Sequence, residues 1–223
     1  MTRHATSSAD SARNRPGLAA IEAALASLAE PAPPDLAHGA LVAVGLADDY
    51  AVIDSPIGPL RVAWNGRGVS AVEGARDDHG FELSFLARTG RRARRREGLP
   101  AGLGRAIERR LAGDRRARIR LDLRGASDFE RAVWLKALEI PRGEVRPYGW
   151  VAAEIGRPKA VRAVGTALGH NPIPLIIPCH RVLASDRKAG GFSAPGGASA
   201  KVRMLALEGV AVGAPAGQMM FGF

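Results

Sequence analysis

The sequence predicts an α/β domain with a small antiparallel sheet, followed by a helical domain with helix-turn-helix proportions. Two observations lead to this fold class. Alternating apolar and polar residues, with turn signals between them, are concentrated in residues 49–124. Helical periodicity replaces them over residues 125–210, where Gly and Pro mark the ends of short helices. The chain has 223 residues, 46% of them hydrophobic and 24% charged, which is enough for a globular core.

The α/β domain is predicted from its strand-like segments. Four segments alternate in polarity: 50–54, 59–64, 68–73 and 117–123. The first two flank the turn signal Ser55-Pro56-Ile57-Gly58. Helices are expected near 79–88 and 100–112. A sheet with short connections and few helices is most simply antiparallel.

The helical domain begins with a strong start signal. Ser127 and Glu130 form an S-x-x-E capping box, and the apolar residues that follow lie on one helical face. Further helices are expected at about 148–155, 159–169 and 199–208. Two of them are separated by Gly156-Arg157-Pro158, which gives helix-turn-helix proportions. Three prolines make residues 171–178 a rigid, extended loop.

The two ends of the chain carry no motif. Residues 1–48 are rich in Ala, Ser and Pro and are expected to be poorly ordered, with one Ala-rich helix over about 17–29. Residues 211–223 are expected to form a C-terminal tail. The sequence has no apolar run long enough to span a membrane and no apolar signal core, so it predicts a cytoplasmic protein.

Positive charge is concentrated after the first third of the chain. The formal net charge is +10, yet residues 1–90 are mildly acidic and residues 91–124 carry 13 arginines against four acidic residues. Arginine matches phosphate geometry, so this asymmetry indicates a polyanionic partner. A run of five arginines within residues 91–96 is equally well explained as a solvated edge strand or loop.

The segment IPCHRV carries the chemistry. The only cysteine, Cys179, is followed directly by His180. A thiolate is a nucleophile and a nearby imidazole can take its proton, although a lone cysteine in an apolar segment is more often a buried small hydrophobe. Motifs of ATP-binding loops, serine hydrolases and metalloproteases are absent from the sequence.

A longer stretch carries a specific resemblance. The segments FERAVWLKALEIPRGEVRPYG, GRPKAVRAVGTALGHNPIPLIIPCHRV and KVRMLALEG, all within residues 127–209, resemble the O6-alkylguanine-DNA alkyltransferases, or methylated-DNA–protein-cysteine methyltransferases. The sheet region, with DSPIGPL near its start, resembles the family's N-terminal domain more weakly. The resemblance implies a ribonuclease-H-like first domain and a winged-helix-like second domain.

The resemblance implies a DNA repair reaction. An alkyl group, typically methyl, would pass irreversibly from O6 of guanine, and also from O4 of thymine, to Cys179 after base flipping. Each molecule would act once. No cofactor or metal is required, and the expected partner is double-stranded DNA with the lesion, bound by a monomer without an obligate protein partner. The expected location is the bacterial cytoplasm, on the nucleoid when DNA is bound.

The resemblance assigns roles at the alkyl acceptor. Cys179 would be the nucleophile, and His180 would take its proton through a bound water while Glu208 orients the imidazole. Asn171 would brace the loop through hydrogen bonds. Tyr148 would donate to the guanine ring and crowd the 3′ phosphate, which helps to rotate the base out.

DNA contact is assigned to the helix expected at 159–169. Arg162 would enter the stack where the flipped base left. Small neighbours would keep this helix thin enough for a narrow minor groove: Val161, Ala163 and Gly165. No Asn or Gln lies on this helix to read bases, which is typical of damage recognition without sequence preference.

The alkyl pocket completes the implied site. Pro174 and Phe192 would form its walls, the Ser193 N–H would face O6, and the Val182 carbonyl would accept from the guanine amino group, together with that of Cys179. Phe192 stands where the family commonly has tyrosine, so the pocket lacks a hydroxyl.

Three other classes of function stay open. A non-catalytic lesion-binding relative would lack the nucleophile that Cys179 supplies. A methyl-sensing transcriptional regulator would need further cysteines, which the sequence does not have. A cysteine hydrolase would turn over a small ester repeatedly.

Overall fold

The computed structural model describes residues 35–186, 192, 194 and 196–212. From Ala37 onward these residues belong to one compact unit. The helix expected at about 17–29 and the predicted pocket residue Ser193 lie outside the described residues. A short helix, α2 (Leu36–Val44), lies within the segment that was expected to be poorly ordered. No helix in the described part of the chain is long and apolar enough to span a membrane.

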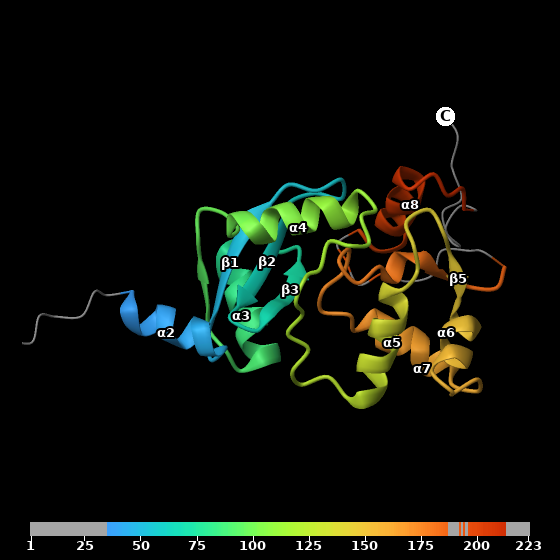
Figure 1. Ribbon diagram of the computed structural model, residues 1–223, viewed down its shortest axis with the longest axis horizontal. Helices are drawn as coiled ribbons and strands as arrows, with labels where there is room; N and C mark the ends of the chain where they lie inside the picture. Colours follow the sequence, from blue (N-terminus) through green and yellow to red (C-terminus); the bar gives the residue numbers. More distant parts are fainter. Residues whose placement is uncertain (1–34, 187–191, 193, 195, 213–223) are drawn as a thin grey trace, which may run out of the picture. The chain divides into compact units, whose positions relative to one another are not determined.

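A four-stranded sheet in the order β3-β2-β1-β4 is the centre of the first half (Figure 1). The first three strands form an antiparallel meander: β1 (Asp48–Ile53), β2 (Leu60–Asn65) and β3 (Gly68–Glu73). They agree with the predicted strands to within two residues.

The prediction of an antiparallel sheet is wrong in one respect, because the sheet is mixed. Strand β4 (Ala93–Arg95) pairs in parallel with β1. Helix α3 (Asp78–Thr89) carries the chain from the β3 edge back across the sheet, so that β4 enters beside β1 in the same direction. This edge strand contains Arg94 and Arg95, so the edge-strand interpretation holds for that part of the arginine run, whereas Arg91 and Arg96 form ion pairs with aspartates of β1.

The strand predicted at 117–123 does not form. Only one isolated bridge joins Val69 to Leu121, with hydrogen bonds from Val69 N to Arg120 O and from Asp122 N to Val69 O. After this bridge the Asp122 side chain points into a buried polar cluster, where it accepts a hydrogen bond from Asn65 Nδ2 at 2.9 Å. The pairing therefore ends after a single residue.

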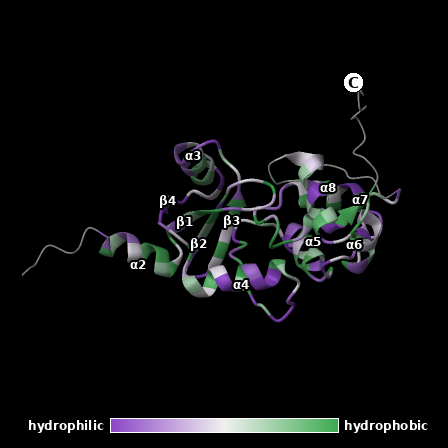
Figure 2. Cartoon of the chain, turned by 90° about the horizontal axis from the view of Figure 1, so that it is seen from above, coloured by the Kyte–Doolittle hydropathy of each residue, from purple (hydrophilic) through white to green (hydrophobic). Residues whose placement is uncertain are grey.

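Helices cover both faces of the sheet. Figure 2 shows α3 and α4 (Ala101–Leu111) on opposite sides of the strands. Phe81 and Phe85 of α3 pack on Tyr50 and its neighbours, whereas Ile107 of α4 joins the larger core that continues into the helical half. This alternation of faces explains why β1 and β2 are buried along most of their length.

The helical half agrees with the prediction. It contains α5 (Asp128–Leu138), α6 (Tyr148–Glu154), α7 (Val161–Gly169) and α8 (Gly197–Leu207). The predicted capping box is present, since Ser127 Oγ accepts from Glu130 N and the Glu130 carboxylate accepts from Ser127 N. The indole of Trp134 donates to the Ala167 carbonyl at 2.7 Å and fixes α5 against α7.

Candidate active site and DNA-contacting helix

The loop between α7 and the cysteine is held in a demanding conformation. Leu175 has a φ of +71°, and its side chain is buried. A positive φ at a non-glycine residue persists only where the surroundings enforce it. Here Ile177 N donates to Ile173 O at 2.9 Å, and Val72 N of β3 donates to Pro172 O at 2.8 Å. The loop is therefore anchored to the sheet before it reaches the cysteine.

Asn171 connects the start of this loop to its end. Its Nδ2 donates to Cys179 Sγ at 3.1 Å and to Ile177 O at 3.0 Å, while its Oδ1 accepts from Ile173 N at 3.0 Å. All three of its polar contacts are buried, which fixes the amide orientation. The structure thus places Asn171 against Cys179, and only 4% of Cys179 is exposed.

A histidine–carboxylate pair lies next to the cysteine. Cys179 and His180 begin a 3-10 turn, Cys179–Arg181, and His180 Nε2 lies 3.0 Å from Glu208 Oε1 at the C-terminal end of α8. Burial acts to raise the pKa of Glu208, but hydrogen bonds from His180 and Arg181 lower it to about 2. Burial lowers the pKa of His180. The pair is therefore a neutral imidazole beside an ionised carboxylate.

This charge state determines the tautomer of His180. An ionised Glu208 can only accept, so the imidazole proton resides on Nε2. The other nitrogen, Nδ1, is left as an acceptor, and it is buried without a hydrogen-bond partner among the described residues. A buried polar atom without a partner is costly, and an unprotonated imidazole nitrogen is suited to taking a proton.

Arg181 was not predicted as a site residue. Its guanidinium donates to both oxygens of Glu208, at 2.9 Å from Nε and 2.8 Å from NH2, and to Ile140 O at 2.7 Å. Only 6% of Arg181 is exposed. A charged side chain inside the IPCHRV segment is the signal that could have indicated a buried ion pair.

Tyr148 reaches the same region through a small parallel pairing. Strand β5 (Arg146–Pro147) pairs with β6 (Val182–Leu183), which follows the Cys179–Arg181 turn directly. Because α6 starts immediately after β5, Tyr148 is brought toward the cysteine. Burial and the charge of Cys179 raise the pKa of Tyr148.

Lys201 is a second buried residue of the site that the sequence does not predict. Its Nζ donates to Val182 O at 2.7 Å and lies 3.4 Å from the Tyr148 hydroxyl, and only 1% of the residue is exposed. Burial lowers its pKa to about 8, while the charge of Cys179 acts in the opposite direction. A lysine at a core-facing position of a predicted helix is the sequence signal that could have indicated a buried, functional side chain.

The predicted DNA-contacting residues lie on the open face of α7. Val161, Arg162 and Ala163 are exposed, whereas the opposite face of the helix is buried. A Cβ at Gly165 would lie 3.9 Å from Cε1 of Tyr148. The structure therefore places α7 beside Tyr148 and leaves Arg162 free to project outward.

The pocket residues are placed only in part. Pro174 and Val182 are buried, and the Phe192 ring lies edge-on to the His180 imidazole with 6.1 Å between centroids. Within the loop, Pro174 forms an isolated parallel bridge with Ile177.

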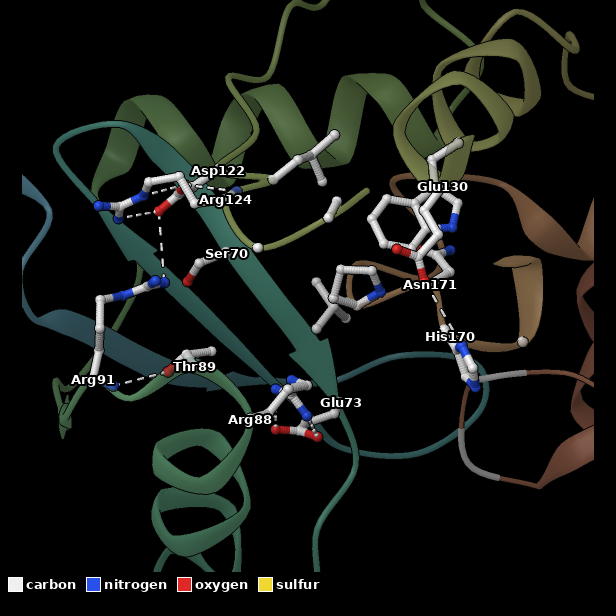
Figure 3. A pocket seen from close by; sticks show the side chains of 17 residues that line it. Ser70, Glu73, Arg88, Thr89, Arg91, Asp122, Arg124, Glu130, His170 and Asn171 are labelled. Atoms are coloured by element: carbon white, nitrogen blue, oxygen red, sulfur yellow. Dashed lines mark hydrogen bonds and ion pairs between the residues drawn. The ribbon is translucent and has the colours of Figure 1, made fainter. Parts of the chain in front are cut away.

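A cavity of about 580 Å³ lies between the sheet and the helices. Cys179 is not among the residues that line it. Figure 3 shows Arg91 and Arg124 converging on Asp122 at one side of it, with Asn171 at the other. Among the described residues, no group of His, Cys, Asp or Glu side chains is arranged to hold a metal ion.

Fold and site together define a protein with a helix-turn-helix half and a buried cysteine, which is followed directly by a histidine that pairs with a glutamate. Comparison with known proteins identifies it more closely. Residues 128–210 match the family model described as 6-O-methylguanine DNA methyltransferase, DNA binding domain. The chain belongs to the family of methylated-DNA–protein-cysteine methyltransferases.

Relatives and solved structures support this membership. The enzyme of that name from Mycobacterium bovis is 40% identical over 164 residues, which cover 71% of this chain and 91% of the relative. The one from Methanosarcina barkeri is 35% identical over 167 residues, 71% of this chain and 96% of the relative. The crystal structure of Mycobacterium tuberculosis OGT in complex with DNA has a TM-score of 0.59 and 39% identity, and covers 72% of this chain and 92% of that one.

Proposed function

We propose that this protein repairs O6-alkylguanine in DNA by transferring the alkyl group to its own Cys179. The observation that carries the proposal is a buried thiol braced by Asn171 and followed by His180, in a chain whose relatives are methylated-DNA–protein-cysteine methyltransferases. The Sγ–carbon bond forms as the carbon–O6 bond breaks. The thiol loses one proton and the purine gains one, so the products are a thioether and an ordinary guanine.

His180 is the base in this proposal. Its Nδ1 takes the thiol proton, directly or through one water, and the resulting imidazolium is stabilised by Glu208 at 3.0 Å. Arg181 keeps the carboxylate ionised and oriented. The thioether has no route back to a thiol, so each molecule reacts once.

Tyr148 is proposed to act on the purine. Negative charge develops on the base as the alkyl group leaves, and a hydroxyl that donates to the ring compensates for it. Lys201 holds this hydroxyl and the Val182 carbonyl in place. That carbonyl retains a second lone pair, with which it accepts from the guanine amino group.

Helix α7 is proposed to lie in the minor groove with Arg162 in the stack. Flipping a base costs a few kcal/mol, and an inserted guanidinium offsets part of that cost. We also propose a ribonuclease-H-like first domain and a winged-helix-like second domain, and action on chromosomal DNA in the bacterial cytoplasm. Alkylated O4 of thymine is a second proposed substrate, because it presents the same alkyl–oxygen bond.

The test is a mass measurement. The protein is incubated with a duplex carrying one O6-methylguanine, and intact and peptide masses are recorded. We expect one methyl group on the peptide that holds Cys179, saturating at one per molecule and absent from Cys179→Ala. Tight binding to the lesion without any gain in mass would overturn the proposal in favour of a non-catalytic lesion-binding protein.

A further inference from the structure

Two neighbouring hollows lie along α4, away from the cysteine. The first has a volume of about 330 Å³ and is lined by four arginines, Arg110, Arg115, Arg118 and Arg120, while its other lining residues are apolar. The second, of about 300 Å³, is lined by the first part of α4 and again by Arg118 and Arg120. No acidic side chain lines either hollow. Residues 118–120 form their common wall.

The positive charge in these hollows is not compensated within the described structure. The side chains of Arg115, Arg118 and Arg120 make no hydrogen bond or ion pair with any described residue, and all three are exposed. Other arginines of the basic segment behave differently, since Arg91 and Arg96 form ion pairs with aspartates of β1. Arg91 and Arg96 therefore stabilise the sheet, whereas Arg115, Arg118 and Arg120 line the hollows without a carboxylate partner among the described residues.

Like charges accumulate further at one end of the first hollow. The Arg110 guanidinium donates to Leu138 O at 2.9 Å and is thereby held in place. Burial lowers its pKa, and the neighbouring charges of Arg181 and Arg115 lower it further. An anion that enters the hollow would relieve this repulsion.

We infer that the two hollows together bind the phosphate backbone of DNA, at a contact separate from α7. Arginine forks match phosphate oxygens, and a basic wall that continues through two hollows suits a polymer with regularly spaced charges better than a single small anion. No residue of α6 or α7 lines either hollow, which makes this contact separate from the one proposed for α7, and the inferred occupant is a second DNA segment. This inference rests on the proposed function only for its choice of DNA as the polyanion.

The test uses the full chain and two lesion-free duplexes labelled in different colours. We expect wild-type protein to bring the two colours together in fluorescence cross-correlation, and R118E/R120E to lose this coincidence. R92E/R105E is the matched control, because these arginines are exposed, line neither hollow and make no side-chain ion pair with described residues. The slope of log affinity against log salt should fall by about 2 in R118E/R120E relative to the control.

Other outcomes overturn the inference. Equal behaviour of the two double variants would mean that the hollows do not bind DNA. Loss of self-association in R118E/R120E, measured by sedimentation without DNA, would identify a second copy of the chain as the occupant. Methyl transfer from a short lesion duplex is measured in parallel. It should stay within about twofold in both variants, and its absence in the wild type would instead refute the proposed function.

Discussion

The thiol of Cys179 is surrounded by groups that favour its ionised form. Asn171 Nδ2 lies 3.1 Å from Sγ, and the cationic Lys201 interacts electrostatically with the same residue. Hydrogen bonds and a nearby positive charge lower the free energy of an anion, whereas burial raises it. The reactivity of the thiol therefore depends on these donors remaining in place.

Substitution of Asn171 tests this dependence. Asn171→Asp keeps an acceptor for Ile173 N but replaces the donor at Sγ with a negative charge, so the thiol pKa should rise. Asn171→Ala removes all three contacts and should lower the free energy of unfolding by about 1 to 3 kcal/mol. Thiol reactivity against pH and urea denaturation measure the two effects. An unchanged thiol pKa in Asn171→Asp would contradict the expectation.

Glu208→Gln tests the orientation of His180. The neutral amide no longer favours the imidazolium, so the single-turnover rate should fall by about tenfold to a hundredfold, within the range of general-base effects. Glu144→Gln is the control, since Glu144 is exposed and pairs only with Arg146. Rates are measured from methyl transfer to Cys179. A loss of equal size in both variants would show that Glu208 acts only through net charge.

At the scale of elements, α7 combines a buried face with a face of small exposed residues. Gly165→Ala adds a Cβ that meets only Tyr148, at 3.9 Å, and should raise stability by about 0.5 to 1 kcal/mol through helix propensity.

Ala163→Gln is the contrasting change on this helix. Ala163 is exposed, so stability should hardly change, but the longer side chain thickens the face proposed to enter the groove. Lesion-duplex affinity should fall about tenfold or more in this variant, which corresponds to about 1.4 kcal/mol. Fluorescence anisotropy measures the affinity. Full affinity in Ala163→Gln would place the DNA elsewhere.

The elements also show how far the sequence predicts this fold. Helices α5 to α8 were predicted within about two residues, because capping residues, Gly and Pro mark their ends locally. The sequence does not predict the parallel pairing of β4 with β1, and it predicts a strand at 117–123 that does not form. Both outcomes depend on contacts between distant residues. In the site, His180 and Asn171 were predicted, but the buried ion pair of Arg181 depends on where α8 ends.

At the scale of the whole molecule, two buried carboxylates make stability depend on pH. Burial acts to raise the pKa of Asp122, but hydrogen bonds from Arg124 and Asn65 lower it to about 2, close to that of Glu208. A lowered folded-state pKa contributes stability above the unfolded-state pKa, and this contribution disappears as the pH falls toward 2. Asp122 is joined to the sheet through Asn65 of β2, whereas Glu208 lies at the end of α8 in the helical half.

Acid denaturation should therefore affect both halves. We expect each carboxylate to contribute about 2 to 3 kcal/mol at neutral pH, lost between about pH 5 and pH 2. Buried, neutral His180 adds to this loss below about pH 6.5, because the unfolded state binds its proton more readily. Urea denaturation at several pH values measures the effect. Asp122→Asn and Glu208→Gln should each flatten the acid limb, and an unchanged limb in both would contradict the assignment.

The buried position of Cys179 has a practical consequence, because it is the only thiol in the chain. A thiol reagent added to the folded protein meets a side chain that is 4% exposed, whereas the same reagent after denaturation labels every molecule whose sulfur is unmodified. The ratio of labelled to total protein then gives the fraction of molecules whose Cys179 has not been alkylated. A purified sample records, molecule by molecule, the alkylation it has met since synthesis.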